Sequence, residues 1–148
     1  RQREELSTRR LEVPKKTIRA KCLDAIQLLS RLESADDNGY CQCVSCNGIF
    51  KWNEMDGGHF IPKGHSSYWS LEKENVHPQC KSCNSFGMKF GTAAQRYTIW
   101  MIDYYGKDFV DLMEESKKRV KKLYKADYDD RLREFNDLIN FHKKRIGL

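Results

Sequence analysis

The sequence predicts an α+β protein with a small zinc-stabilised centre between N- and C-terminal α-helices. The first observation is a pair of C-x2-C motifs, Cys43 with Cys46 and Cys80 with Cys83. This spacing lets a tight turn direct two thiolates at one ion, so the four cysteines predict one tetrahedral, structural Zn²⁺ site. The second observation is that apolar residues recur at helical spacing on both sides of this centre.

The first helix is expected from about residue 16 to residue 33. Its apolar positions follow helical spacing and are Ile18, Cys22, Ile26, Leu29 and Leu32. An Asp-Asp-Asn-Gly run at 36–39 ends the helix with a turn. Residues 1–36 are therefore predicted to form a basic N-terminal helical segment of a single domain that covers 1–148.

Residues 37–91 form the predicted zinc-bound core. They are rich in glycine, serine, asparagine and aromatic residues, and their short β-like pieces lie at 40–43, 49–52 and 58–61. The Asn-Gly pair at 47–48 is a tight-turn signal after the first cysteine pair. Such short strands bury little apolar surface, so this core is expected to depend on its zinc for folding.

The last part of the chain, 92–148, is predicted to be helical. One helix begins with Thr92 as its N-cap and ends at Gly106. A second helix covers about 108 to 118, and a third covers about 127 to 145.

The composition is that of a solvated, basic protein. The 148 residues include 27 basic and 21 acidic residues, which give a net charge of +6. No stretch approaches the ~20 apolar residues of a membrane span, and the N-terminus lacks the apolar stretch of a signal peptide. We therefore expect an intracellular protein with no membrane partner. Cysteines stay reduced in that compartment, which favours thiolates on zinc over disulfides.

The basic residues are grouped in blocks within 1–21, 117–125 and 143–145. Clustered cations suit the phosphate backbone of DNA, where counterion release drives association. The alternative for any one block is a solvated helix face. The side chains expected to contact DNA are Lys63, His65, Lys81, Lys117, Lys118, Lys121 and Lys122.

His59 is a candidate general base, although a lone histidine is more often structural. A neutral imidazole can remove a proton from water that attacks a phosphodiester. Asn84 directly follows the last cysteine and offers a hard amide oxygen of the kind that Mg²⁺ or Mn²⁺ accepts. A histidine and an amide beside a structural zinc are what a small metal-dependent nuclease needs.

Two stretches resemble the HNH (ββα-metal) endonucleases in their HNN form, GHFIP at 58–62 and NVHPQCKSCN at 75–84. More narrowly, YCQCVSC at 40–46, DGGH at 56–59 and NVHPQC at 75–80 are similar to the phage recombination nuclease family called NinG or Rap. The resemblance is weaker in the outer helices. It implies an HNH-like ββα-metal core and metal-dependent cleavage of branched recombination intermediates, such as Holliday junctions and D-loops, in the cytoplasm of the host cell.

The resemblance also implies roles for three residues. His59 would be the general base, and Asn84 would bind the catalytic metal. Asn75 corresponds to the middle asparagine of the motif, which usually braces the hairpin through backbone hydrogen bonds and does not touch the substrate.

One position departs from the family pattern. The aspartate that usually precedes the catalytic histidine, and binds the metal, is Gly58 here. Asp56 lies two residues earlier on the same face of a strand, so it could reach the same ion. His77 is the other candidate ligand. The alternatives are a capping turn for Asp56 and a packed ring for His77.

The missing aspartate leaves a second function open, a catalytically inactive, zinc-stabilised DNA-binding module in which His59 only packs. A redox role is disfavoured, because neither cysteine pair has a βαβ setting and each has a second pair with which to share zinc. Symmetric cutting of a four-way junction requires two active sites, which predicts a homodimer. Three aromatic residues could stack on unpaired bases or belong to the core; they are Trp52, Tyr68 and Trp69.

Overall fold

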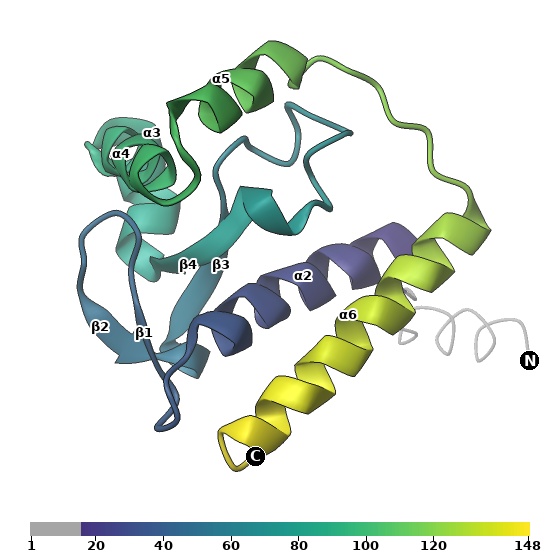
Figure 1. Cartoon of the computed structure of the whole chain (residues 1–148), viewed down its shortest axis with the longest axis horizontal. Coiled ribbons are helices and arrows are strands. Elements are labelled where there is room, and N and C mark those ends of the chain that lie inside the picture. Colours follow the sequence, from purple (N-terminus) through teal and green to yellow (C-terminus); the bar gives the residue numbers. More distant parts are fainter. Residues whose placement is uncertain (1–15) are drawn as a thin grey trace, which may run out of the picture.

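A two-stranded antiparallel hairpin lies at the centre of the computed structural model, which describes residues 16–148 (Figure 1). Its strands are β3 (Met55–His59) and β4 (Val76–Cys80), with Met55 opposite Cys80 and His59 opposite Val76. β3 thus begins three residues before the predicted piece at 58–61 and ends two residues before the end of that piece. β4 is missing from the predicted strands, because it is buried along its whole length and lacks the alternation that marks a half-buried strand.

A second hairpin carries the first cysteine pair. It consists of β1 (Tyr40–Gln42) and β2 (Ile49–Lys51), which pair antiparallel and match the predicted pieces at 40–43 and 49–52 to within one residue. The predicted turn is present, with Asn47 in the left-handed region at φ 62°. Asparagine tolerates this conformation better than other side chains do.

Helix α2 (Ile18–Ser34) packs against one face of the central hairpin. The helix begins after Thr17, whose Oγ1 accepts a hydrogen bond of 3.1 Å from the backbone N–H of Ala20. Strand and helix approach so closely that a Cβ on Gly57 would lie 2.6 Å from Gln27 Cα, which requires glycine at this position. The predicted helix at 16–33 is confirmed, because α2 covers nearly the same residues.

Helix α6 (Lys125–Arg145) lies alongside α2 (Figure 1). Phe135 and Ile139 of α6 are buried in the same hydrophobic cluster as Ile26 of α2. At the far end, Arg145 Nη2 donates to the carbonyl groups of Leu32 and Ala35 and so satisfies the last turn of α2.

The opposite face of the hairpin is covered by α4 (Ala93–Tyr105), with α5 (Lys107–Ser116) packed beside it. Tyr97 is fully buried, and its hydroxyl donates a hydrogen bond of 2.8 Å to the carbonyl of Gly58. Gly106 separates the two helices at φ +91°, as expected for a helix stop. Thr92 is the N-cap residue of α4, as predicted, although its side chain makes no capping hydrogen bond.

A helical run follows β4 directly and escaped the sequence-based prediction. It continues through one π-helical stretch, Cys83–Gly87, into the short helix α3 (Met88–Phe90). Two 3-10 turns, Trp52–Glu54 and Lys73–Asn75, lead into β3 and β4. The mixed architecture of helices and small sheets agrees with the predicted α+β class. Among the described residues, no helix has the length and apolar character that crossing a bilayer requires.

Candidate functional site

The two cysteine pairs meet although they lie in different hairpins. Ligand atoms of Cys43, Cys46, Cys80 and Cys83 all lie within 4.8 Å of one another, and the Sγ atoms of Cys46 and Cys80 are 3.8 Å apart. A tetrahedral zinc with bonds of about 2.3 Å has sulfur–sulfur edges of about 3.8 Å. The cluster therefore has the donor set and the size to hold a metal such as zinc.

Backbone amides surround the sulfur atoms. The N–H of Cys46 points at Cys43 Sγ at 3.5 Å, and that of Gly48 points at Cys46 Sγ at 3.4 Å. Burial acts to raise the pKa of Cys80, but hydrogen bonds from Ser82 and Cys83 outweigh it and lower this pKa to about 7. At Cys80 these contacts favour the thiolate, which is the form that binds metal, whereas burial and the neighbouring cysteines raise the pKa of Cys46 and that of Cys83.

The two remaining cysteines lie outside this cluster. Cys22 is buried in α2, and its thiol donates to the carbonyl of Tyr128 at 3.3 Å. The Cys41 thiol donates to the carbonyl of Arg31 at 3.1 Å, and burial raises its pKa to about 11. Neither side chain belongs to the four-cysteine cluster, as the C-x2-C spacing predicts.

Asp56 and Asn84 are in direct contact beside the cysteine cluster. The Nδ2 group of Asn84 donates to Asp56 Oδ2 at 3.1 Å, and Lys81 Nζ donates to Asp56 Oδ1 at 2.9 Å. Partial burial acts to raise the pKa of Asp56, but these two hydrogen bonds and the charges of Lys81 and Arg31 lower it below its ordinary value. Asp56 is therefore an ionised carboxylate at neutral pH, held next to an amide.

Gly58, where the family pattern has aspartate, faces a buried side chain that excludes any larger residue. A Cβ on Gly58 would lie 1.9 Å from Gln79 Oε1. Gln79 is fully buried, and its Nε2 donates to Ser45 Oγ at 2.9 Å. The hydroxyl of Ser45 donates its proton to the carbonyl of Ala93, so Ser45 Oγ can only accept a hydrogen bond from Gln79. This fixes the orientation of the Gln79 side-chain amide. Among residues 16–148, Gln79 Oε1 has no hydrogen-bond partner.

His59 ends β3 with its ring held by one backbone contact. Its Nε2 lies 2.8 Å from the carbonyl of Ser70. A carbonyl can only accept, so Nε2 carries the proton of the neutral ring and Nδ1 keeps its lone pair. Burial lowers the pKa of His59, and the charges of Lys63 and Arg19 act in the same direction, against the contact with Ser70. The ring is therefore a neutral proton acceptor at neutral pH.

Asn75 joins the two ends of the segment between β3 and β4. It is fully buried; its Nδ2 donates to the carbonyl of Ile61 at 2.9 Å, and its Oδ1 accepts from the N–H of Ile61 at 2.8 Å. The N–H of Phe60 donates to the carbonyl of Asn75. Asn75 thus fixes the position at which the chain leaves β3, directly after His59.

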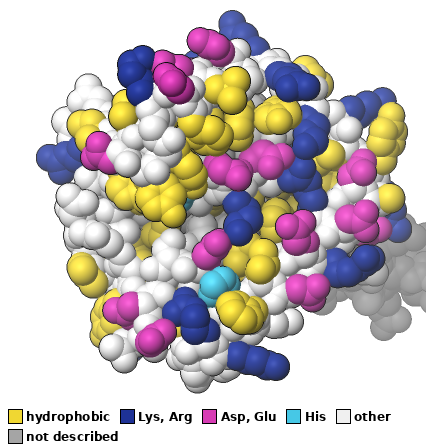
Figure 2. All heavy atoms as spheres, viewed as in Figure 1, with side chains coloured by type: hydrophobic (Ala, Val, Ile, Leu, Met, Phe, Trp, Pro, Cys, Tyr) yellow, Lys and Arg dark blue, Asp and Glu magenta, His cyan; other side chains and the backbone are white. Residues whose placement is uncertain are grey.

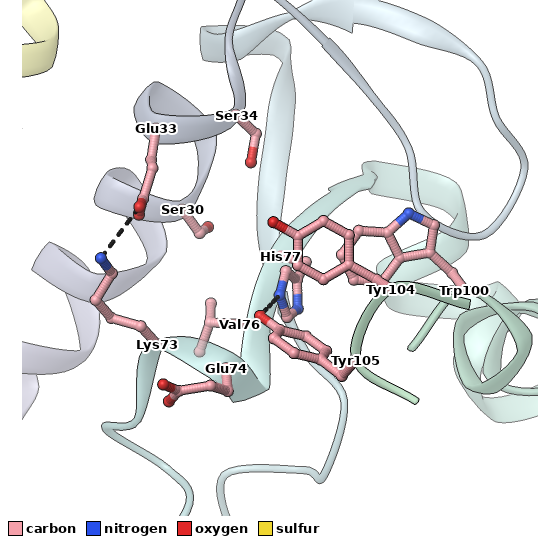
Figure 3. Close-up of a pocket in the computed structure, with 10 residues that line it drawn as sticks. All are labelled: Ser30, Glu33, Ser34, Lys73, Glu74, Val76, His77, Trp100, Tyr104 and Tyr105. Carbon is pink, nitrogen blue, oxygen red and sulfur yellow. Dashed lines mark hydrogen bonds and ion pairs between the residues drawn. The ribbon is translucent and has the colours of Figure 1, made fainter. Parts of the chain in front are cut away.

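His77 lies on β4 in a polar and aromatic pocket of about 480 Å³ (Figure 3). Its Nδ1 is 3.0 Å from the hydroxyl of Tyr97, and its Nε2 is 2.9 Å from that of Tyr105. Burial lowers the pKa of His77 to about 3. Both ring nitrogens are engaged by tyrosines of α4, so these surroundings are those of a packed ring, the alternative to a metal ligand.

The residues predicted to contact DNA lie in two regions: Lys81 is beside the cysteine cluster, and the others are around the segment after β3. Lys63 and His65 are exposed in the segment after β3. The basic segment between α5 and α6 runs beside the same region, because the N–H of Lys121 donates to Ser67 Oγ at 3.1 Å. Two of its cations are already paired, Lys117 with Glu114 and Lys121 with Glu72, while Lys118 and Lys122 belong to no ion pair among residues 16–148.

The face formed by α2 and α6 mixes charges of both signs (Figure 2). The C-terminal basic block is on α6, where Arg145 pairs with Asp37 at 3.1 Å. This face therefore fits the solvated alternative better than a uniform cationic surface. Most of the N-terminal block falls on residues 1–15, which lie outside the described part of the chain.

The predicted base-stacking aromatics belong largely to the core. Trp69 is buried against Phe109 in the cluster under α4 and α5, and Trp52 packs partly against the α2 cluster. Phe86 and Phe90, in the helical run that follows the second cysteine pair, are exposed aromatic residues. An F-x3-F pattern with a lysine before the second phenylalanine was the signal in the sequence that could have identified them.

Comparison with known proteins assigns the chain to a family. The family model described as bacteriophage lambda NinG protein matches residues 1–144. Neither the curated proteins nor the solved structures include a significant match. Because the family match spans nearly the whole chain, including both cysteine pairs and His59, Asn75 and Asn84, this chain belongs to the bacteriophage lambda NinG protein family.

Proposed function

We propose that this protein is a metal-dependent DNA endonuclease of the HNN type that hydrolyses phosphodiester bonds in branched recombination intermediates, such as Holliday junctions and D-loops. One observation carries the proposal. Asp56 and Asn84 are 28 residues apart in sequence, and their side chains are in contact at 3.1 Å. Asp56 lies on the strand that ends in His59, and Asn84 lies on the helical run that follows β4.

Asp56 and Asn84 would hold the catalytic Mg²⁺ or Mn²⁺. A carboxylate and an amide are the hard oxygen ligands that these ions accept, and the lowered pKa keeps Asp56 ionised. Rotation of the Asn84 amide would turn its oxygen toward the same side as Asp56 Oδ2. When bound, such an ion would polarise the scissile phosphate and stabilise the leaving 3′-oxygen.

Asp56 would take the place that Gly58 vacates. Alternate residues of a strand share a face, and Asp56 precedes Gly58 by two residues, a shift of roughly 6.6 Å along the strand. Gln79 fills the space where a side chain at residue 58 would lie, which gives a physical reason for the displacement.

His59 would accept the proton of the attacking water at Nδ1. Its Nε2 contact with Ser70 sets the tautomer and the orientation, and burial keeps the ring neutral. Asn75 would support this geometry from the backbone on the other side of Ile61. These roles match those of the HNN resemblance, and the order β3, β4, helical run is the order that a ββα-metal core requires.

The zinc in this proposal is structural. It would link the β1–β2 hairpin to the end of β4, and so position Asn84, which directly follows the ligand Cys83. DNA in the host-cell cytoplasm is the proposed partner, and a homodimer would supply the two active sites for a symmetric cut.

A second function has two observations in its favour. Lys81 already neutralises Asp56, and a side chain at Gly58 is excluded, which would suit a zinc-stabilised DNA-binding module without catalysis. The two are separated by incubating the protein with a four-way junction, a D-loop and a linear duplex in Mg²⁺, in Mn²⁺ and without divalent metal. Cleavage that requires the metal supports the nuclease, whereas binding without cleavage in either metal supports the module.

A further inference from the structure

Two phenylalanines stand out on the surface of the helical run after β4. The side chains of Phe86 and Phe90 are 68% and 75% exposed, and their ring centroids lie 5.2 Å apart at an interplanar angle of 44°. They are one helical turn apart and so share a face. An adjoining pair of exposed aromatic rings is an apolar patch that indicates an interaction site.

The surroundings of this pair are basic. Exposed Lys89 lies on the same run and exposed Arg96 follows on α4, while the charge of exposed Lys81 is paired with Asp56. The sequence has neither aspartate nor glutamate between Glu74 and Asp103. A second copy of the chain would bring the same cations against this patch, and like charges repel. The charge of the patch instead complements a phosphate backbone.

The patch is held rigidly and next to the proposed catalytic metal site. The π-helical stretch that contains Phe86 begins at Cys83 and includes Asn84. At the other end, Met88 packs against the buried cluster of α4, and the N–H of Gly91 donates to the carbonyl of Gly87 at 3.1 Å. A surface fixed at both ends loses little conformational entropy when it binds.

We infer that Phe86 and Phe90 form an aromatic wedge that stacks on unpaired or unstacked bases at the branch point of DNA, and that this wedge gives the protein its preference for branched over linear DNA. The DNA substrate in this inference rests on the proposed function. Phenylalanine has no hydrogen-bonding group, so it stacks on any base without reading sequence. Bases inside a continuous duplex are covered by their neighbours, whereas a branch point offers open faces into which apolar side chains insert.

The test compares the parent protein with the double variant Phe86→Ala/Phe90→Ala. Phe141→Ala is the matched control, because Phe141 is 63% exposed on α6, away from the cysteine cluster. Affinity is measured by fluorescence anisotropy, without Mg²⁺ or Mn²⁺, on a four-way junction and on a linear duplex of equal length. A second junction carries 2-aminopurine at the branch point to report unstacking.

The double variant should lose about tenfold or more in affinity for the junction, as expected for the loss of base–aromatic stacking, and stay within about twofold of the parent on the duplex. The 2-aminopurine signal of the parent should disappear in the double variant and persist in Phe141→Ala. Circular dichroism and zinc content check that the double variant is folded.

Three results would overturn the inference: equal losses on both DNAs, no loss on the junction, or a loss that tracks the dissociation of a dimer in sedimentation. The nuclease proposal fails separately. If the parent prefers junctions through these phenylalanines but cleaves no DNA in either metal, the catalytic assignment is wrong and the wedge stands. A double variant that cleaves junctions as selectively as the parent does would overturn the wedge alone.

Discussion

The Nδ2 group of Asn84 donates a hydrogen bond of 3.1 Å to Oδ2 of Asp56, and this contact joins the helical run after the second cysteine pair to the central strand β3. It holds a carboxylate two residues before Gly58, the position at which the family pattern has aspartate. The contact defines the most direct tests of the proposed site.

Removal of either partner should raise the divalent metal concentration that half-maximal cleavage requires. We expect Asp56→Ala and Asn84→Ala to lose cleavage in Mg²⁺ and to recover part of it at high Mn²⁺, because each loses one oxygen ligand. Lys81→Met should act in the opposite direction, since it removes the ammonium group 2.9 Å from Asp56. Cleavage rates over a metal titration measure both effects. A silent Asp56→Ala variant would remove Asp56 from the metal site.

His59→Ala should lower the cleavage rate by about 10² to 10⁴, the usual cost of losing a general base. Zinc content and DNA affinity should match the parent, because the ring contacts neither the cysteine cluster nor the basic segment. Burial lowers the pKa of His59, so the parent's rate should be level at neutral pH and fall only below about pH 6.5, where the ring begins to bind a proton. Unchanged cleavage by His59→Ala would contradict the nuclease proposal.

The cysteine cluster should bind about one Zn²⁺ per chain and stabilise the core. Cys80→Ser should lose the metal and melt well below the parent, because β1, β2, β3 and β4 are too short to bury a sufficient core without it. Cys41→Ser is the matched control, since Cys41 is buried nearby but bonds to Arg31. Elemental analysis and thermal denaturation measure both outcomes, and equal zinc loss in the two variants would refute the assignment.

Gly58→Ala should destabilise the fold by about 1–3 kcal/mol, the usual cost of overpacking a core. Its new methyl group would collide with Gln79 Oε1, which would lie 1.9 Å away. Gly64→Ala is the matched control, because a Cβ there meets nothing within 4 Å. Adding Gln79→Ala to Gly58→Ala removes the colliding atom, so denaturant unfolding should show less destabilisation in the double variant than the sum of the two single changes.

His77 should make the fold sensitive to mild acid. Its pKa is about 3 in the folded protein, against about 6.5 in an unfolded chain. Between these values only the unfolded state binds the proton, so the stability that is present above pH 6.5 is lost as the pH falls toward 3, by up to about 1.4 kcal/mol per pH unit. His77→Gln should have a shallower slope of unfolding free energy between about pH 5 and 6.5. A slope equal to that of the parent would exclude His77 as its source.

Local signals in the sequence determined the helices and the four-cysteine cluster of this protein. Periodic apolar residues and the Gly106 stop define α2, α4 and α6, because helix formation depends on residues three and four positions apart. The C-x2-C spacing identified all four members of the cysteine cluster, because a knuckle is built from adjacent residues. The turn at the Asn-Gly pair after Cys46 was likewise predicted from adjacent residues.

Contacts between distant residues could only be decided by the tertiary structure. β4 is buried along its whole length and became a strand through its pairing with β3, which its own sequence does not encode. Asp56 meets Asn84, and His77 meets Tyr97 and Tyr105, across elements whose relative placement no local pattern specifies. Exposure is likewise a property of the packed whole. Trp69 is buried under α5 and Phe86 is exposed, although both are aromatic residues in the same part of the chain.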